Sequence, residues 1–303
     1  MRYLILLAFL AFSCATPGTP EPDFRHLAYS IEGLVTQFNG DAGVYIKHLP
    51  TGNEITINAD TVFPTASMVK VPILAALFDR IENGELEYRE KFYFDGQHNY
   101  GGFRDVISNM TDSSEVYLDM LIHLMMSVSN NTASLWNQHI AGGGEGINAW
   151  LGENGFENTR VNSRTPGREE AQARYGWGQT TPREMARLLE MIYLGEAVNP
   201  HASEKMYRIM TRNFWDGEAL SQIPPYINVA SKNGAVSRSR SEVLLVNAPS
   251  GDYLLCIITK NQNDNTWDFE NEGWVLARTI SRLAWQTFEP GDTWEPDEHV
   301  ARY

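Results

Sequence analysis

Phe63-Pro-Thr-Ala-Ser-Met-Val-Lys70 is the stretch around which the rest of this chain is organised, because it opens an apolar run of helical spacing at 66–86. Ser67 and Lys70 are three residues apart, so in a helix both side chains project from one face and the ammonium lies beside the hydroxyl. A serine hydroxyl becomes a good nucleophile only when a neighbouring base takes its proton. Lysine can be that base when burial or a second cation lowers its pKa below the usual value of about 10.4. Taken alone, the pair also fits a simpler interpretation, a solvent-facing serine and lysine.

Strand-like segments lie towards both ends of the chain, and helical patterns dominate the middle. Alternating residues predict strands at 43–48 and 54–58, joined by a Pro-Thr-Gly-Asn turn, and a second hairpin at 242–247 and 253–259. Apolar spacing predicts further helices at 24–38, 116–127, 131–141, 182–194, 203–210 and 270–287. We therefore expect an α/β (α+β) fold. An antiparallel sheet flanked by helices is built from 24–64 and 214–288, with an inserted all-helical region at 65–213 and an acidic tail at 289–303.

Composition excludes several classes of function. The 303 residues include 24 basic and 38 acidic side chains, a net charge of −14, and such a surface repels a phosphate backbone. Two cysteines cannot build a disulfide framework, and neither they nor the seven histidines show metal-ligand spacing. We expect no nucleic-acid partner, no metal and no cofactor, and a monomeric protein.

The N-terminus has the pattern of an export signal. Residues 1–13 carry one positive charge, at Arg2, before an apolar run that is too short to span a bilayer, which takes about 20 residues. Leu10-Ala-Phe-Ser-Cys14 resembles a bacterial lipobox, which would make Cys14 the lipidated first residue and 14–23 a tether. Ordinary signal cleavage around Ser13-Cys14-Ala15, or a buried N-terminal strand or helix, are the alternatives. The main expectation is an exported protein, periplasmic or held at the outer membrane only through Cys14.

Two later segments add polar groups of complementary chemistry. Ser129-Asn-Asn131 supplies a hydroxyl and two amides, which can shuttle a proton and hold a substrate amide, although such residues also cap helices. Lys232-Asn-Gly234 begins an apparent strand, where the lysine supplies a cation and the N–H of Ala235 can point at an oxyanion. A plain Lys-Asn-Gly turn is the alternative.

In this order and spacing the three segments resemble the SxxK, SDN and KTG motifs of class A β-lactamases and penicillin-binding proteins. The resemblance covers about residues 24–288. It implies that Ser67 attacks a carbonyl to form an acyl-enzyme, while Lys70 and Ser129 move the proton. It also implies that the N–H groups of Ser67 and Ala235 form the oxyanion hole.

The resemblance assigns binding roles as well. Asn131 would bind the substrate side-chain amide, and Lys232 would recognise the substrate carboxylate, with Asn233 and Gly234 beside it. Arg240, or Arg238 if the register differs, would face the same carboxylate. Tyr100 is either a wall of the site or an ordinary loop aromatic.

Three positions depart from the family pattern. Between the second and third motifs, class A enzymes carry a glutamate that activates the water for deacylation. In this sequence Thr165 stands near that position. Glu169 or Glu170 could replace it, or both could be solvated loop carboxylates. Asn130 replaces an aspartate, and Asn233 replaces a threonine or serine. Acylation is therefore expected, and fast deacylation is not assured.

The expected activity is hydrolysis of β-lactam amides through an acyl-serine. The alternatives are a D,D-peptidase or another amide or ester hydrolase with the same acylation machinery, acting on a peptidoglycan-like substrate. A further alternative is not an enzyme but a non-catalytic penicillin-binding protein.

Overall fold

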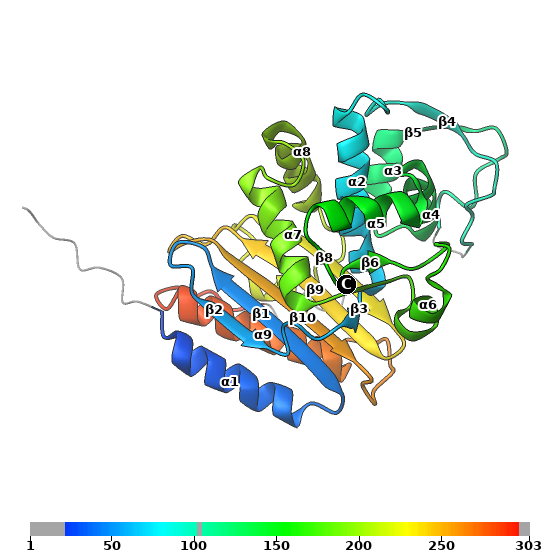
Figure 1. Cartoon of the computed structure of the whole chain (residues 1–303). Coiled ribbons are helices and arrows are strands. Elements are labelled where there is room, and N and C mark those ends of the chain that lie inside the picture. Colours follow the sequence, from blue (N-terminus) through cyan, green and yellow to red (C-terminus); the bar gives the residue numbers. More distant parts are fainter. Residues whose placement is uncertain (1–21, 102–104, 297–303) are drawn as a thin grey trace, which may run out of the picture.

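The computed structural model describes residues 22–101 and 105–296, and at its centre lies a five-stranded antiparallel sheet (Figure 1). Its strands follow the order β2-β1-β10-β9-β8. Their bounds are β1 (Asp41–His48), β2 (Glu54–Ile57), β8 (Val229–Val236), β9 (Ser239–Val246) and β10 (Tyr253–Lys260). β1 pairs with β10 from Asp41 opposite Lys260 to His48 opposite Tyr253. Strands from the two ends of the chain thus form one sheet, as predicted.

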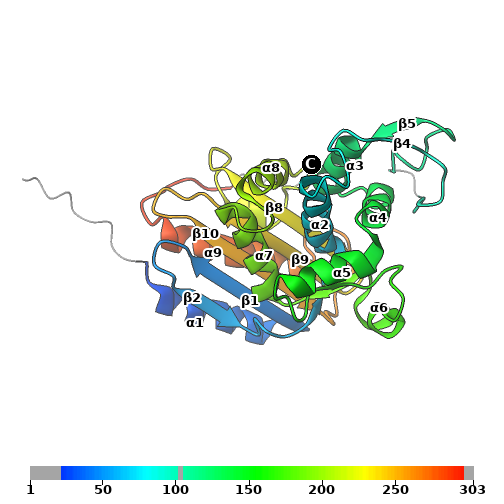
Figure 2. The ribbon, with the colours of Figure 1, turned by 45° about the horizontal axis from the view of Figure 1, so that its top comes forward.

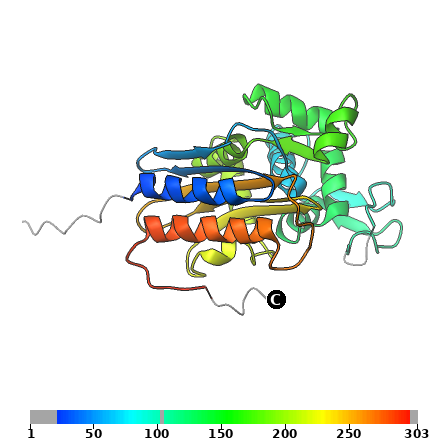
Figure 3. The same ribbon diagram turned by 90° about the horizontal axis from the view of Figure 1, so that it is seen from below.

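Two helices from opposite ends of the chain cover one face of this sheet. α1 (Phe24–Gln37) and α9 (Glu272–Phe288) lie side by side in the view from below (Figure 3). The short helix η2 (Ala219–Gln222) packs against α9. The core on this side includes Leu27, Ile280 and Trp285, which pack with Leu244 and Val246 of β9.

The remaining helices lie on the other face and beyond one end of the sheet (Figures 1 and 2). They are η1 (Ala66–Val69), α2 (Lys70–Glu82), α3 (Leu118–Ser127), α4 (Asn131–Ile140), α5 (Gly143–Glu153), α6 (Glu169–Tyr175), α7 (Pro182–Leu194) and α8 (Pro200–Met210). α7 packs on β1, β9 and β10, and α2 packs among α3, α4, α5 and α8. Every residue from Lys70 to Phe78 is buried, as expected of a helix that is apolar on all sides. Lys70 is therefore carried into the interior by its own helix.

Two small sheets complete the architecture. One joins β3 (Phe63–Pro64), β7 (Gly178–Thr180) and β6 (Arg160–Val161), and the other pairs β4 (Lys91–Tyr93) with β5 (Glu115–Tyr117). Thr65 N donates to Gly178 O at 2.9 Å. The segment that leads to Ser67 is therefore fastened to the end of the loop at 160–182.

The fold class predicted from the sequence is confirmed, with differences of detail. The helix expected at 66–86 begins as the 3₁₀ helix η1 and ends at Glu82, and α5, α6 and the short strands were not predicted. The predicted export segment, with Cys14, lies outside the described residues. Within the described ranges, no helix is both long and apolar enough to cross a membrane.

Candidate active site

Lys70 links the first two sequence motifs. Its Nζ lies 3.0 Å from Ser67 Oγ and 2.8 Å from Ser129 Oγ, and it donates to Ser129 O at 2.7 Å and Asn131 Oδ1 at 3.0 Å. One amine placed between two hydroxyls can take a proton from one and pass it to the other. The structure thus brings Ser67, Lys70, Ser129 and Asn131 together, as the sequence predicted.

The backbone at both hydroxyl-bearing segments adopts an unusual conformation. Ser129 has φ 58° and Ala66, directly before the nucleophile, has φ 45°. Such left-handed values cost free energy for residues with a Cβ and persist only where the surroundings impose them. Ser67 follows within η1, at the start of the helical run that continues as α2, so the two serines approach Lys70 from separate elements.

Burial and a second cation tune Lys70. Burial lowers the pKa of Lys70 well below its ordinary value, and the charge of Lys232 lowers it further, while Asp105 acts in the opposite direction. Burial also lowers the pKa of Lys232 to about 7, partly offset by Glu242. Both effects favour the neutral amine of Lys70, the form in which a lysine can act as a base.

The third motif lies against the nucleophile. A Cβ built on Gly234 would fall 2.7 Å from Ser67 N and 2.8 Å from Thr65 O, so only glycine allows β8 to approach this closely. The backbone of Gly234 and Ala235 therefore runs past the Ser67 N–H, where an oxyanion hole requires converging N–H groups. Lys232 lies two residues before Gly234 on β8 and is buried. Its Nζ donates to Asn233 O at 3.0 Å and to Asn233 Oδ1 at 3.2 Å.

Asp105 supplies a carboxylate that the sequence analysis missed. Asn130 stands where the family has aspartate, and its Nδ2 donates to Asp105 Oδ1 at 2.9 Å while its Oδ1 caps α4 at Ala133 N. Asp105 also accepts from Thr132 N at 3.2 Å and from Thr132 Oγ1 at 2.5 Å. Burial opposes ionisation of Asp105, but the bonds from Thr132 and Asn130 outweigh it and keep its pKa below the ordinary value. No motif or spacing marks this aspartate in the sequence.

Arg240 does not reach the site, which corrects the expectation that it faces the substrate carboxylate. It stacks on Trp267 and Trp274 and donates to Val236 O and Ser239 O, on the sheet face covered by α9. The alternative, Arg238, donates to Gln262 O and Asn261 O, each at 2.8 Å.

Ser241 is the residue of β9 that lies on the active-site face. Successive strand residues point to opposite faces, so Ser241 points away from the face that Arg240 occupies. Its Oγ donates to Gly234 O at 3.1 Å and Thr65 O at 3.2 Å. Ser241 therefore holds the third motif against the segment that precedes Ser67.

The structure does not join the two candidate deacylation bases to the nucleophile. Glu169 and Glu170 are exposed in the first turn of α6, a helix with no buried residue, and Glu169 accepts a hydrogen bond from Gly167 N at 3.1 Å. In the part of the chain that is described, neither carboxylate forms a hydrogen bond with Ser67 or Lys70. Thr165 turns away and packs against Gly144 of α5, with Oγ1 donating to Ser163 O.

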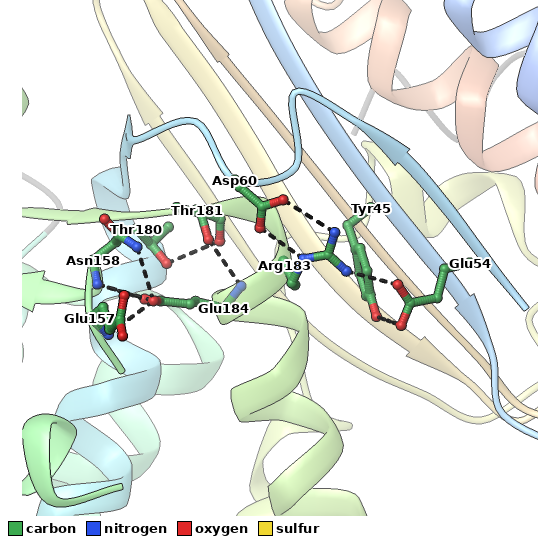
Figure 4. Close-up of polar contacts among 9 residues, drawn as sticks. All are labelled: Tyr45, Glu54, Asp60, Glu157, Asn158, Thr180, Thr181, Arg183 and Glu184. Carbon is green, nitrogen blue, oxygen red and sulfur yellow. Dashed lines mark hydrogen bonds and ion pairs between the residues drawn. The ribbon is translucent and has the colours of Figure 1, made fainter. Parts of the chain in front are cut away.

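Glu184 holds the base of the loop at 160–182 (Figure 4). It caps the turn before β6 by accepting from Asn158 N at 3.0 Å, from Thr159 N at 2.6 Å and from Thr159 Oγ1 at 2.6 Å. Thr159 Oγ1 also lies 2.7 Å from Thr180 Oγ1, which joins the two ends of the loop. Next to Glu184, Arg183 pairs with acidic side chains near β2, so the start of α7 is anchored on both sides.

Tyr100 lies beside the second motif. Its N–H donates to Thr132 Oγ1 at 2.9 Å, and its ring meets Trp177 edge-on, with ring centroids 5.3 Å apart. Trp177 belongs to the loop at 160–182. These contacts place Tyr100 close to Asn131, and its role as a wall of the substrate site stays a prediction.

The described residues include no group of three or more histidine, cysteine or acidic side chains placed to hold a metal ion. The chemistry available from the residues at hand is acyl transfer to a serine. Ser67 and Ser129 are placed to exchange protons with Lys70, and the buried Lys232 lies beside the third motif.

Comparison with known proteins agrees with this geometry. The family model described as "Beta-lactamase enzyme family" matches residues 26–288. The chain is 21% identical to β-lactamase VEB-1 of Pseudomonas aeruginosa, over 95% of this chain and 97% of that protein. It is 23% identical to β-lactamase AER-1 of Aeromonas hydrophila, over 86% and 87%.

Solved structures show the same fold. An acyl-enzyme complex of a mutant of PBP-A with penicillin G superposes with a TM-score of 0.78 at 26% identity, covering 90% of this chain and all of that one. A β-lactamase from Sphaerobacter thermophilus gives 0.77 at 21% identity, covering 88% and 98%. This chain belongs to the β-lactamase enzyme family and is a serine hydrolase of the class A β-lactamase type.

Proposed function

We propose that this protein hydrolyses β-lactam amides through an acyl-enzyme on Ser67. The observation that carries the proposal is the position of Lys70 Nζ, 3.0 Å from Ser67 Oγ and 2.8 Å from Ser129 Oγ, within a buried site. Membership of the family and the penicillin complex of PBP-A support the choice of substrate.

Acylation follows from this placement. Ser67 Oγ attacks the lactam carbonyl carbon and gives its proton to neutral Lys70, while the N–H groups of Ser67 and Ala235 stabilise the oxyanion. Ser129 then gives its own proton to the lactam nitrogen and takes the proton held by Lys70. The C–N bond breaks, the ring opens and an ester joins the acyl group to Ser67. Lys232 attracts the substrate carboxylate, and Asn131 holds the side-chain amide.

Deacylation is the step that separates the candidate functions. A water molecule must attack the ester, and among the described residues neither Glu169 nor Glu170 forms a hydrogen bond with Ser67 or Lys70. This observation favours a second candidate, a D,D-peptidase or related amide hydrolase. In such an enzyme a β-lactam acylates the serine, and the acyl group is released only slowly.

Intact-mass spectrometry after brief and long exposure to penicillin G distinguishes the candidates. A transient increase by the mass of penicillin supports hydrolysis, and a persistent one supports the peptidase or a penicillin-binding protein without turnover. Unmodified protein at both times would contradict acylation altogether. Ser67→Ala is the control, and equal turnover of a chromogenic cephalosporin by wild type and Ser67→Ala would remove Ser67 from the mechanism.

We further propose that the protein is exported and anchored through Cys14. The support is the apolar run before Leu10-Ala-Phe-Ser-Cys14. Metabolic labelling with a radioactive fatty acid should mark the wild type and not Cys14→Ser. Equal labelling would contradict the anchor, and cleavage of both without label would favour ordinary signal cleavage.

A further inference from the structure

Residues 213–215, between α8 and η2, present two exposed aromatic side chains. Phe214 is 64% exposed and Trp215 is 41% exposed, and their rings meet at 88° with centroids 5.1 Å apart. Exposed aromatic rings offer apolar contact area to a ligand, and tryptophan is enriched at binding interfaces.

This aromatic pair is fixed to the segment that carries Ser129. Trp215 Nε1 donates to Val128 O at 2.9 Å, and Phe214 N donates to Ser127 O at 2.9 Å. The indole therefore rests on the residue directly before the serine that passes the proton to the leaving nitrogen.

The same segment is also fixed to the strand that carries Lys232. Asn213 Nδ2 donates to Ser231 Oγ at 3.0 Å, and Asn233 Nδ2 lies 3.4 Å from Trp215 O. Asn213 in turn accepts from Trp215 N at 3.2 Å, which keeps the segment in a tight turn. Residues 213–215 thus bridge the second and third motifs, and the two rings are exposed at that bridge.

We propose that Phe214 and Trp215 form a subsite for an aromatic or flat apolar substituent on the part of the substrate that bears the carboxylate. The inference rests on the proposed function, because it takes Lys232 as the partner of that carboxylate. A group attached near the carboxylate would lie beside Asn233 and Val128, where the two rings are held. The perpendicular pair offers the face of one ring and the edge of the other, which suits a planar substituent.

The subsite is separate from the aromatic pair Tyr100 and Trp177. That pair is tied to Thr132, next to Asn131, and so belongs with the acyl side chain of the substrate. The two pairs should therefore discriminate different halves of a substrate. Tyr100→Ala is accordingly a matched control for Phe214→Ala, since each removes one exposed ring from the site.

The test uses two cephalosporins that share one acyl side chain and differ beside the carboxylate, where one carries an aryl group and the other a methyl group. The second-order rate constant for acylation of the full-length protein is measured by quenched-flow mass spectrometry. Phe214→Ala should slow the aryl compound by about 10-fold, since an aromatic pair contributes up to about 1.5 kcal/mol, and the methyl compound by less than about 2-fold. Phe214→Tyr should restore the preference, and Tyr100→Ala should slow both compounds equally.

The outcomes separate this inference from the proposed function. If wild type is acylated by both compounds and Phe214→Ala slows them equally, the subsite is wrong and the proposed function stands. If neither compound acylates Ser67 in wild type, the proposed function fails and the subsite fails with it. Circular dichroism of Phe214→Ala verifies folding, and the ring of Phe214 makes no hydrogen bond that its removal would break.

Discussion

Gly234 shows how strictly single residues are constrained at this site. Its Cα lies where any side chain would meet the backbone of Ser67 and Thr65, so the third motif and the nucleophile can be neighbours only through glycine. Ala66 and Ser129 hold left-handed φ values of 45° and 58° in the same site. The geometry around Ser67 is thus imposed by close backbone packing as much as by the polar side chains.

Gly234→Ala should lower the acylation rate by about 100-fold, because the added methyl displaces β8 from the oxyanion position. The protein should still fold, since the obstruction is confined to the site. Acylation by penicillin G measures the loss. Gly152→Ala on α5, where a Cβ meets nothing within 4 Å, is the control and should leave the rate unchanged. Equal rates for the two variants would show that β8 is not held against Ser67.

The two lysines predict a bell-shaped pH profile for kcat/KM, which reports the free enzyme. Activity should rise with pH as Lys70 loses its proton, at a pH well below the ordinary lysine value because burial lowers its pKa. It should fall above about pH 7, because Lys232, with its pKa lowered by burial to about 7, loses the charge that attracts a carboxylate.

Two comparisons test the assignment of the alkaline limb. A substrate without a carboxylate should lack it, and Lys232→Arg should move it to higher pH because arginine stays charged. If the pH profiles of wild type, of wild type with the substrate that lacks a carboxylate, and of Lys232→Arg all coincide, Lys232 does not attract the carboxylate.

At the scale of elements, Asp105 connects a loop to the start of α4. The Asp105 carboxylate accepts hydrogen bonds from Asn130 and Thr132 with both of its oxygens. Asp105→Asn replaces one of these oxygens with an NH₂ group, which can only donate. We expect a loss of about 2–4 kcal/mol in the free energy of unfolding, and slower acylation because Ser129 precedes this cap. Urea denaturation measures the first effect. Asp112→Asn, an exposed aspartate, should change neither property, and an Asp105→Asn protein as stable as this control would contradict the role.

Elements with a marked apolar stripe were predictable, and those without one were not. α7 begins at Pro182 with Thr181 as its cap and was predicted to the residue, whereas α6 buries nothing and leaves no periodic signal. The error at Arg240 has a different cause. β9 is buried on both faces, so its apolar residues do not alternate and the sequence cannot show which face a given side chain occupies.

At the scale of the whole molecule, buried carboxylates between the sheet and α9 make stability depend on pH. Burial raises the pKa of Glu242 to about 8, helped by Glu218, and burial raises that of Glu218 to about 7 against the effect of Arg278. Because these folded-state values exceed the unfolded ones, the folded protein holds extra protons above about pH 4.5. The stability that these groups contribute is therefore present at low pH and is lost as pH rises towards 8.

Glu242→Gln should accordingly gain stability relative to wild type as pH increases, by the order of 2 kcal/mol at pH 9, and differ little at pH 5. The lowered pKa of Lys232 makes the free energy of unfolding rise with pH, which opposes the effect of Glu242. The effect of Glu242 is therefore measured as the difference in stability between Glu242→Gln and wild type. Thermal unfolding from pH 5 to 9 provides the measurement, with the exposed Glu196→Gln as control. A constant difference between the two variants over this range would mean that Glu242 does not titrate in the folded protein.

The pairing of β1 with β10 has a consequence for the time at which this protein becomes active. β1 is made early in translation, but one of its two neighbours in the sheet is β10, the last strand among the described residues, and the strand bearing Lys232 is also made late. A ribosome-bound intermediate can contain the complete Ser67–Lys70–Ser129 segment and still lack the strand that closes the oxyanion site. Pairing between such distant segments slows folding, and the site around Ser67 stays incomplete until both parts of the sheet have come together.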